Sequence, residues 1–320
     1  MPPSRIVAFI SASICWFRPP ASSALSGFDN SRLHRLAQAS SLSYLTIDRM
    51  PSSPYLEASN LEPITQVFDT QSESGATIFR SFDSTNSEEE NICKLVVACR
   101  GSATPLNFST NLRFNLVPAT QLSLNFVPDN ALVHEGFQQA SVGLWRELSQ
   151  PLMEHLDDSS ISEIIFTGHS LGAATALLCA TQYNTSFKDY PSPSVVTFGG
   201  PKLCNTILAR HLQDEVLKGC DIVHLVHSKD PVLANNQQLW DTLGFESAGV
   251  EVECDPYSPI VWDDNAPKST VPTFAWNIVD HCKYMVCLVT FCHRIAFLSN
   301  EQMATNISYI HQQQTSRESM

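Results

Sequence analysis

Residues 164–178 read IIFTGHSLGAATALL. A short apolar run leads into Gly168-His169-Ser170-Leu171-Gly172, and a run of helix-favouring residues follows. A serine between two glycines, at the point where a strand turns into a helix, is the pattern of a nucleophile elbow. In that turn Gly168 and Gly172 leave room for neighbouring backbone. The pattern therefore predicts that Ser170 is presented at the carboxyl edge of a sheet, beside a helix N-terminus that favours negative charge.

Buried apolar runs alternate with helical patterns on both sides of this stretch. Such alternation predicts a parallel sheet with helices on both faces. The run at 281–298 is apolar enough for a buried helix or strand. Strands are expected at 76–82, 92–99, 163–168, 194–201 and 221–231, and helices at 31–45, 136–148, 171–182 and 203–217.

The bulk composition is that of one large globular domain. The chain has 320 residues, of which 43% are hydrophobic and 16% charged, and neither a repeat nor a break in composition divides it. Its net charge is −13, and it has no cluster of lysine and arginine. Because phosphate contacts need such clusters, nucleic acid is not an expected partner.

The ten cysteines do not form a CxxC pair, so the sequence predicts no metal site. Cys93 and Cys99 would share one face of a strand but lie roughly 20 Å apart, which is too far for a disulfide. Most of the others lie in apolar runs. Buried free thiols are the favoured interpretation, and a few disulfides are the alternative.

The two ends of the chain differ from its middle. Residues 1–28 contain no acidic residue, two arginines and an interrupted apolar run that is too short to span a bilayer. These features are typical of a targeting or signal segment and predict secretion, with a plastid or other organelle as the first alternative and an ordinary N-terminal extension as the second. Residues 301–320 form a polar C-terminal tail, which leaves 29–300 as the single folded domain.

A serine becomes a nucleophile when a histidine takes its proton and an acid orients that histidine. In an elbow-type site the order along the chain is serine, acid, histidine. Asp230 follows the apolar run 222–227 at the carboxyl end of a strand, and is the expected acid. His281 opens an apolar segment after it and is the expected base. The other later histidines, His293 and His311, lie in an apolar run and in the polar tail.

The oxyanion of an ester transition state needs two hydrogen-bond donors. The backbone N–H of Leu171 is the first expected donor. The second is expected in the loop after an earlier strand, where CRGS places Ser102. The side chain of His169 leaves the tight turn in another direction, so His169 is not expected to act as the base.

The segments RGS, LVHEGF, FTGHSLGAA, TFGGPK, DP and HCKY resemble, in order and context, the fungal-type class 3 lipases. The resemblance covers about residues 32–290. It implies an α/β-hydrolase fold, with a mostly parallel central sheet and a short lid, that hydrolyses acylglycerol-type esters without a cofactor. It places the triad on Ser170, Asp230 and His281 and an oxyanion residue on Ser102. His134, in VHEGF, is expected to be structural.

The resemblance places the lid at about 103–112, just after the oxyanion loop. Leu106, Phe108 and Leu112 are too apolar for an ordinary surface loop and suit a flap that opens at a lipid–water interface. A loop packed permanently on the core is the alternative. The segment 233–280 departs most from the family, which leaves the acyl pocket and the choice of substrate open.

Several functions fit this sequence. A lipase acting on acylglycerols is the main hypothesis, and phospholipase A1 or galactolipase is the alternative within the enzyme class. A feruloyl-type esterase fits less well because of the apolar lid. A catalytically inactive, lipase-like binding protein is disfavoured because all three triad residues are present in order.

Overall fold

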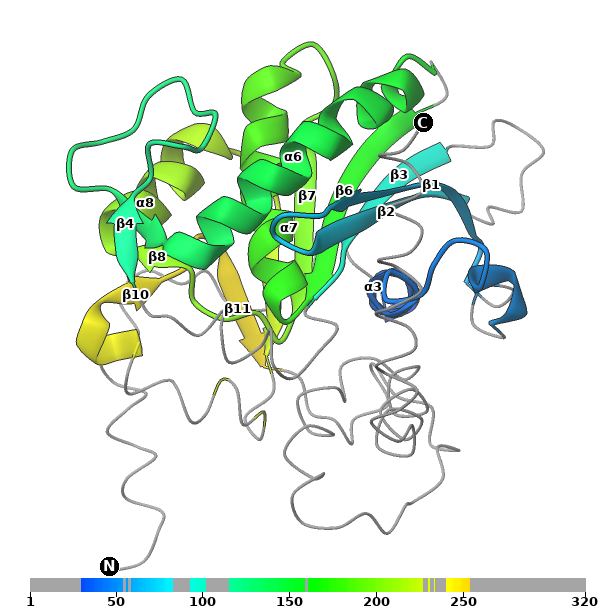
Figure 1. The fold of residues 1–320 in the computed structure, drawn as a ribbon, viewed down its shortest axis with the longest axis horizontal. Coiled ribbons are helices and arrows are strands. Elements are labelled where there is room, and N and C mark those ends of the chain that lie inside the picture. The colour runs from blue at the N-terminus through cyan, green and yellow to red at the C-terminus, as the bar shows by residue number, and fades with distance from the viewer. Residues whose placement is uncertain are drawn as a thin grey trace, which may run out of the picture.

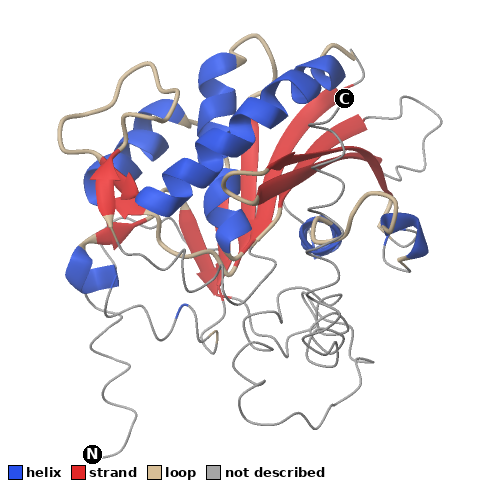
Figure 2. Ribbon diagram, in the orientation of Figure 1, coloured by secondary structure: helices blue, strands red, loops and turns tan. Residues whose placement is uncertain are grey.

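The computed structural model describes residues 30–53, 56, 59–82, 93–101, 115–158, 161–226, 230, 233 and 240–253 (Figure 1). Within these residues the fold is a central sheet with helices on both faces (Figure 2). In chain order its elements are α3 (Asn30–Leu42), η2 (Met50–Ser52), β1 (Leu61–Asp69), β2 (Ser74–Phe82), β3 (Cys93–Cys99), β4 (Leu116–Pro118), β5 (Leu132–His134), α6 (Glu135–Leu156), β6 (Ile161–His169), α7 (Leu171–Ser186), β7 (Pro193–Phe198), β8 (Cys204–Asn205), α8 (Thr206–His211), η3 (Leu212–Val216), β9 (Ile222–Val226), β10 (Phe245–Glu246) and β11 (Val250–Glu253).

The central sheet has the strand order β1-β2-β3-β6-β7-β9-β11. The pairs β1–β2 and β2–β3 are antiparallel, and the four pairs from β3–β6 to β9–β11 are parallel. The predicted mostly parallel sheet is therefore confirmed. Because β3, β6, β7 and β9 run in the same direction, their carboxyl ends meet at one edge, and the elbow lies there.

Two apolar layers hold the helices to the sheet. On one face α7 packs against β6 and β7, and α6 packs on α7. On the other face α3 packs against β3, β6 and β7. The alternation of the strands explains this division: Val195 faces the α7 side and Val196 the α3 side of the same strand. Helix α7 lies between the sheet and α6 and is buried over most of its length, which explains its run of alanine and leucine.

Helix α6 begins at the predicted structural histidine. The side chain of His134 accepts a hydrogen bond from the Phe137 backbone N–H at 3.3 Å and stacks on the Phe137 ring at 3.9 Å between centroids. The His134 side chain thus satisfies one of the N–H groups that the first turn of a helix leaves without a partner. The structural role expected for His134 is confirmed.

Some expected elements were wrong in extent or missing. Strand β1 was not expected, because Pro63 interrupts its pattern. The proline is tolerated because β1 is an edge strand whose pairing shifts register between Pro63 and Thr65. The helix expected at 203–217 is divided into β8, α8 and η3, because Cys204 and Asn205 pair in a second, small sheet of order β10-β8-β5-β4.

The five cysteines in the described part of the chain are free thiols. Cys93, Cys99, Cys179 and Cys204 are buried and Cys220 is half-buried, as the favoured interpretation predicted for them. The segments 1–28, 281–298 and 301–320 lie outside the described residues. None of the described helices combines the length and the apolar character that crossing a membrane requires.

Candidate functional site

The turn between β6 and α7 consists of Ser170 alone. Its backbone has φ 59° and ψ −127°, in a region that residues other than glycine seldom occupy. The Ser170 N–H donates to the Phe198 carbonyl at 3.1 Å, and the Ser170 carbonyl accepts from Ala173 N–H at 2.9 Å. These bonds hold the strained residue between a neighbouring strand and the first turn of α7. This is the sharp, strained turn that a nucleophile elbow requires.

The two glycines of the motif have the role that the sequence indicated. A methyl group on Gly172 would overlap the Cys99 carbonyl and lie 2.9 Å from the Gly101 nitrogen. A methyl group on Gly168 would overlap the Gly172 carbonyl and lie 2.9 Å from the Cys99 oxygen. The neighbours are backbone atoms, which cannot move aside as a flexible side chain can. Only glycine lets β6, the start of α7 and the end of β3 approach so closely.

Ser170 does not use its side chain to cap α7. A serine at a helix start often accepts a hydrogen bond from the helix's own N–H groups, and this one makes no such capping bond. The residue is 5% exposed, and Leu171, which supplies the predicted oxyanion N–H, is the first residue of α7. The macrodipole of a helix favours negative charge at this end.

The loop predicted to carry the second oxyanion donor begins beside the elbow. Strands β3 and β6 are paired in parallel with Cys99 opposite Gly168, so Gly101 lies next to the turn. Arg100, just before it, donates to the Glu73 carbonyl at 2.9 Å and stacks over the Phe68 ring, 4.7 Å from its centroid. Burial lowers the pKa of the Arg100 guanidinium. These contacts anchor the start of the loop to the β1–β2 hairpin.

Asp230 lies four residues after the last residue of β9, and its side chain is fully buried. Strand β9 is parallel to β7, with Leu225 opposite Phe198, and β7 is parallel to β6, with Phe198 opposite His169. The strand that leads to Asp230 therefore ends at the same sheet edge as the strand that leads to Ser170. A buried carboxylate after this strand is compatible with the predicted role of Asp230 as the orienting acid of a triad, which stays a prediction.

The structure describes part of the predicted site. Ser170, Leu171, Gly168 and Gly172 form one turn, and Asp230 follows a strand that ends at the same edge of the sheet. The predicted base, oxyanion serine and lid residues lie outside the described residues, and they remain predictions: His281, Ser102, Leu106, Phe108 and Leu112. Within the described residues, no group of three or more histidine, cysteine or acidic side chains is placed to hold a metal ion.

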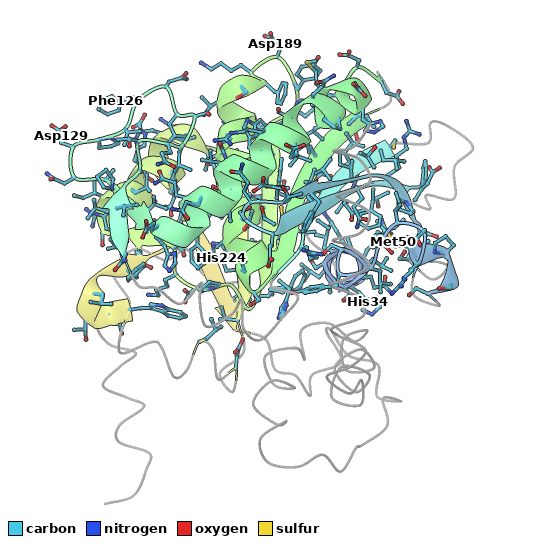
Figure 3. All side chains as sticks on the ribbon, in the orientation of Figure 1. His34, Met50, Phe126, Asp129, Asp189 and His224 are labelled. Atoms are coloured by element: carbon cyan, nitrogen blue, oxygen red, sulfur yellow. The ribbon has the colours of Figure 1, made fainter. Side chains whose placement is uncertain are left out.

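A buried histidine lies behind the elbow, on the α7 side of the sheet (Figure 3). His224 Nε2 donates to the Ala248 carbonyl at 2.6 Å, and its Nδ1 bonds the Thr197 hydroxyl at 2.6 Å. Burial lowers the pKa of this imidazole, although the carboxylates of Glu251 and Glu246 act in the opposite direction. His224 thus ties β9, the strand before Asp230, to β7 and to the β10–β11 turn.

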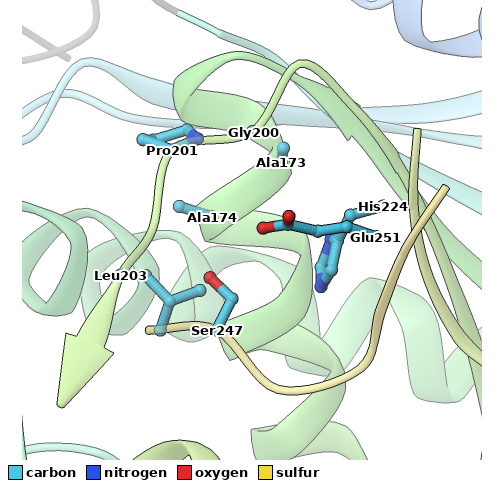
Figure 4. A pocket seen from close by; sticks show the side chains of 8 residues that line it. All are labelled: Ala173, Ala174, Gly200, Pro201, Leu203, His224, Ser247 and Glu251. Atoms are coloured by element: carbon cyan, nitrogen blue, oxygen red, sulfur yellow. The ribbon is translucent and has the colours of Figure 1, made fainter. Parts of the chain in front are cut away.

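His224 also lines a small pocket between the start of α7 and the β10–β11 segment (Figure 4). Glu251 lies beside His224, and Leu203 and Ser247 face them from the other side. Ala173 and Gly200 close it on the side of α7. The pocket lies next to the elbow, and its walls bring a histidine, a serine and a carboxylate together without placing them on Ser170.

One residue at the elbow had no signal in the sequence. The Tyr44 hydroxyl is 3.1 Å from His169 Nδ1, within hydrogen-bonding distance. The two residues are 125 positions apart in the sequence. Tyr44 follows α3 in an irregular segment, so neither periodicity nor a local motif could have indicated the contact.

The described residues have the α/β-hydrolase fold. The structure of lipase II from Rhizopus niveus superposes with a TM-score of 0.57 over 70% of this chain and 80% of that one, at 21% identity. At that level of identity the similarity concerns the fold alone. The predicted fold class, including helices on both faces of a mostly parallel sheet, is therefore confirmed.

Within that class, residues 96–235 match the family described as "Lipase (class 3)". The predicted resemblance to class 3 lipases is confirmed. The chain is 32% identical to "Phospholipase A(1) DAD1, chloroplastic" of Arabidopsis thaliana, over 43% of this chain and 32% of that protein. It is 29% identical to "Secreted mono- and diacylglycerol lipase A" of Penicillium cyclopium, over 43% of this chain and 41% of that protein. The matches thus span less than half the length of these curated relatives.

Proposed function

We propose that the chain is a serine hydrolase of carboxylic esters that acts on acylglycerol-type lipids. In the proposed reaction the Ser170 hydroxyl attacks the ester carbonyl while His281 takes its proton. Asp230 orients His281, and the Leu171 N–H and Ser102 bind the oxyanion. The alcohol leaves with the proton from His281, and water then releases the fatty acid from the acyl-enzyme by the same steps in reverse.

The observation that carries this proposal is the backbone of Ser170. A serine backbone at φ 59° and ψ −127° between a strand and a helix is strained. The fold can maintain it because Gly168 and Gly172 have no side chain that would overlap the neighbouring backbone. A nucleophile elbow holds its serine in such a turn so that the hydroxyl is presented to a histidine and to backbone donors.

The relatives and the predicted lid support the proposed lipid class. The relatives named above include a phospholipase A1 and a mono- and diacylglycerol lipase. We propose a lipid ester at a lipid–water interface as the substrate, which the apolar residues Leu106, Phe108 and Leu112 would contact. The two relatives are named as chloroplastic and secreted, and these are the two destinations that the sequence predicted for this chain.

Phospholipase A1 activity is the second candidate. The Arabidopsis phospholipase A1 has the higher identity of the two relatives, 32% against 29%. Hydrolysis of an acyl ester in a phospholipid would call on the same proposed triad, so the site does not separate the two activities. The two activities differ in the polar head group of the substrate.

A panel of lipids tests the proposal. The purified chain is incubated with vesicles or emulsions of triacylglycerol, diacylglycerol, monoacylglycerol, phosphatidylcholine and monogalactosyldiacylglycerol, and released fatty acid is measured by mass spectrometry. The expected result is release from the neutral acylglycerols that disappears in Ser170→Ala. Release from phosphatidylcholine alone would establish the second candidate. No release from any lipid, with no reaction of Ser170 with a fluorophosphonate, would overturn the hydrolase proposal and favour a binding protein.

A further inference from the structure

The end of α3 reaches the elbow from the opposite face of the sheet to α7. Helix α3 packs on β3, β6 and β7, and the chain then turns at Ser43 and Tyr44. The Ser43 hydroxyl donates to the Ser40 carbonyl at 2.7 Å, and the Tyr44 N–H donates to the Ser41 carbonyl at 3.2 Å. This turn places the Tyr44 side chain at the carboxyl edge of β3 and β6.

The Tyr44 hydroxyl lies where two parts of the proposed site meet. It bonds His169 Nδ1 at 3.1 Å, and His169 is the last residue of β6, directly before Ser170. It also lies against Gly101, the residue before Ser102: a methyl group on Gly101 would overlap the Tyr44 hydroxyl and lie 2.6 Å from the His169 carbonyl. One phenol thus touches both the residue before the proposed nucleophile and the residue before the proposed oxyanion serine.

The segment that carries Tyr44 is itself held in place. Gln66, on β1, donates from Nε2 to the Leu45 carbonyl at 2.8 Å and accepts the Ile47 N–H on Oε1 at 3.1 Å. The same Nε2 donates to the Thr77 hydroxyl on β2 at 3.0 Å. A side-chain amide from the antiparallel half of the sheet therefore fixes the backbone on the C-terminal side of Tyr44. The tyrosine is presented from a supported position.

We propose that Tyr44 is a positioning residue for the hydrolysis proposed above. By bonding His169 and covering Gly101, it fixes the spacing between the elbow and the loop that carries Ser102. The inference rests on the proposed function, since it assigns Tyr44 to the same reaction. Tyr44 acts through these two residues, and it takes no part in proton transfer.

A positioning role has a kinetic signature. The spacing between nucleophile and oxyanion donors matters in the transition state, where the carbonyl oxygen carries charge, and matters little for binding of the substrate. Loss of the hydroxyl is therefore expected to lower kcat and leave KM almost unchanged. A misplacement of about 1 Å costs about 10²-fold in rate, so a fall of about 10- to 100-fold in kcat is the expected range.

The experiment compares Tyr44→Phe with the wild type on a soluble p-nitrophenyl ester, with Tyr190→Phe as the matched control. Tyr190 lies beyond α7, and its hydroxyl donates to Asp157 at 2.7 Å, so the control also removes one phenol hydrogen bond. Tyr44→Phe is expected to lower kcat as stated, with KM changed less than twofold and with a melting temperature close to that of Tyr190→Phe. Wild-type kcat in Tyr44→Phe, or a loss that only follows a fall in melting temperature, would overturn the inference.

A double-mutant cycle tests whether Tyr44 acts through His169. In a His169→Leu background, Tyr44→Phe is expected to have little further effect on kcat, because the hydrogen bond is already absent. An unchanged effect in that background would contradict the assignment to His169.

The ¹⁵N chemical shift of His169 Nδ1 gives a reading without activity. It is expected to change in Tyr44→Phe and not in Tyr190→Phe, and an unchanged shift would overturn the contact. If the shift changes but the wild type neither hydrolyses esters nor reacts with a fluorophosphonate, the proposed function fails while the contact stands. The positioning role then fails with that function.

Discussion

At the scale of single residues, the site depends on groups that the sheet brings to one edge. The packing around Ser170 holds its backbone in a strained conformation, and Asp230 is a fully buried acid four residues after the end of β9, the next strand but one from β6. A buried carboxylate is costly unless it is paired or hydrogen-bonded. An acid that orients a histidine has such a partner, and this is the role proposed for Asp230.

Asp230→Asn is expected to preserve the fold and reduce ester hydrolysis. Asparagine has nearly the same shape but carries no charge to stabilise the imidazolium and favours the wrong tautomer of the histidine. In triads of this type the change lowers kcat by about 10⁴-fold. The measurement is kcat on p-nitrophenyl butyrate, with Asp221→Asn as the control, since Asp221 is exposed and lies at the opposite end of β9. An Asp230→Asn variant with more than a tenth of the wild-type kcat would exclude Asp230 as the acid.

At the scale of elements, the elbow depends on the close approach of α7 to the end of β3. Gly172→Ala introduces a methyl group against the Cys99 carbonyl, so either α7 or the strand must move. Overpacking of this kind costs about 1–3 kcal/mol in the free energy of unfolding. Because the displaced parts are the elbow and the oxyanion loop, hydrolysis is expected to fall as well.

Gly143→Ala, in α6, is the matched control for that change. There the methyl group meets the end of the Asp69 side chain, which can rotate away at the cost of its hydrogen bonds from Ser72. Alanine also favours a helix over glycine by about 0.5–1 kcal/mol. Urea unfolding is expected to show a clear loss for Gly172→Ala and a much smaller change for Gly143→Ala. Equal losses of stability in the two variants would show that the close approach of backbone atoms at the elbow does not make an added methyl group more costly there.

The free energy of unfolding is expected to depend on pH through the buried His224, which links β9 to its neighbours. Burial lowers the pKa of His224, so the folded state holds this imidazole neutral at pH values where the unfolded chain, with a pKa of about 6.5, binds a proton. Its contribution to stability is therefore complete above pH 6.5. It is lost as the pH falls below 6.5 towards the pKa of the folded state, by up to about 1.4 kcal/mol per pH unit.

His224→Asn removes this titration. Urea unfolding between pH 5 and pH 7.5 is expected to show a shallower acid-side loss of stability in the variant than in the wild type. The comparison uses the slopes, because the variant also loses the hydrogen bonds to Thr197 and Ala248 and is less stable at every pH. Identical slopes would show that protonation of His224 does not oppose folding.

The sequence predicted those elements whose own pattern specifies them. The runs at 92–99 and 163–168 are continuous and apolar because β3 and β6 are covered on both faces, and the α7 pattern follows directly. Strand β1 and the second sheet were missed. Pro63 breaks the pattern of β1, and the two-residue strands β8 and β10 exist only through pairing with distant segments.

The same distinction applies to the site. Ser170, Gly168 and Gly172 belong to one local motif, and Asp230 could be selected because a strand precedes it. The contact between Tyr44 and His169, and the bonds of His224 to Thr197 and Ala248, join residues that only the folded sheet brings together. No periodicity or spacing encodes them.

At the scale of the whole molecule, the helices on both faces of the central sheet support the edge at which the elbow lies. Helices α7 and α6 pack on one face of the sheet at the elbow, and α3 packs on the other face. Strand β9 leads to Asp230. The chain is acidic overall, with a net charge of −13, so attraction between opposite charges would not draw it to an anionic lipid surface. The proposed contact with lipid therefore relies on apolar side chains.

The central claim is that Ser170 is the nucleophile, and covalent labelling tests it most directly. The full chain and Ser170→Ala are incubated with a fluorophosphonate, and the modified peptide is identified by mass spectrometry alongside hydrolysis of p-nitrophenyl butyrate. The account predicts an adduct on Ser170 in the wild type. In Ser170→Ala it predicts neither adduct nor hydrolysis, with an unchanged circular dichroism spectrum. An adduct on another residue, or hydrolysis that persists in a folded Ser170→Ala, would contradict it.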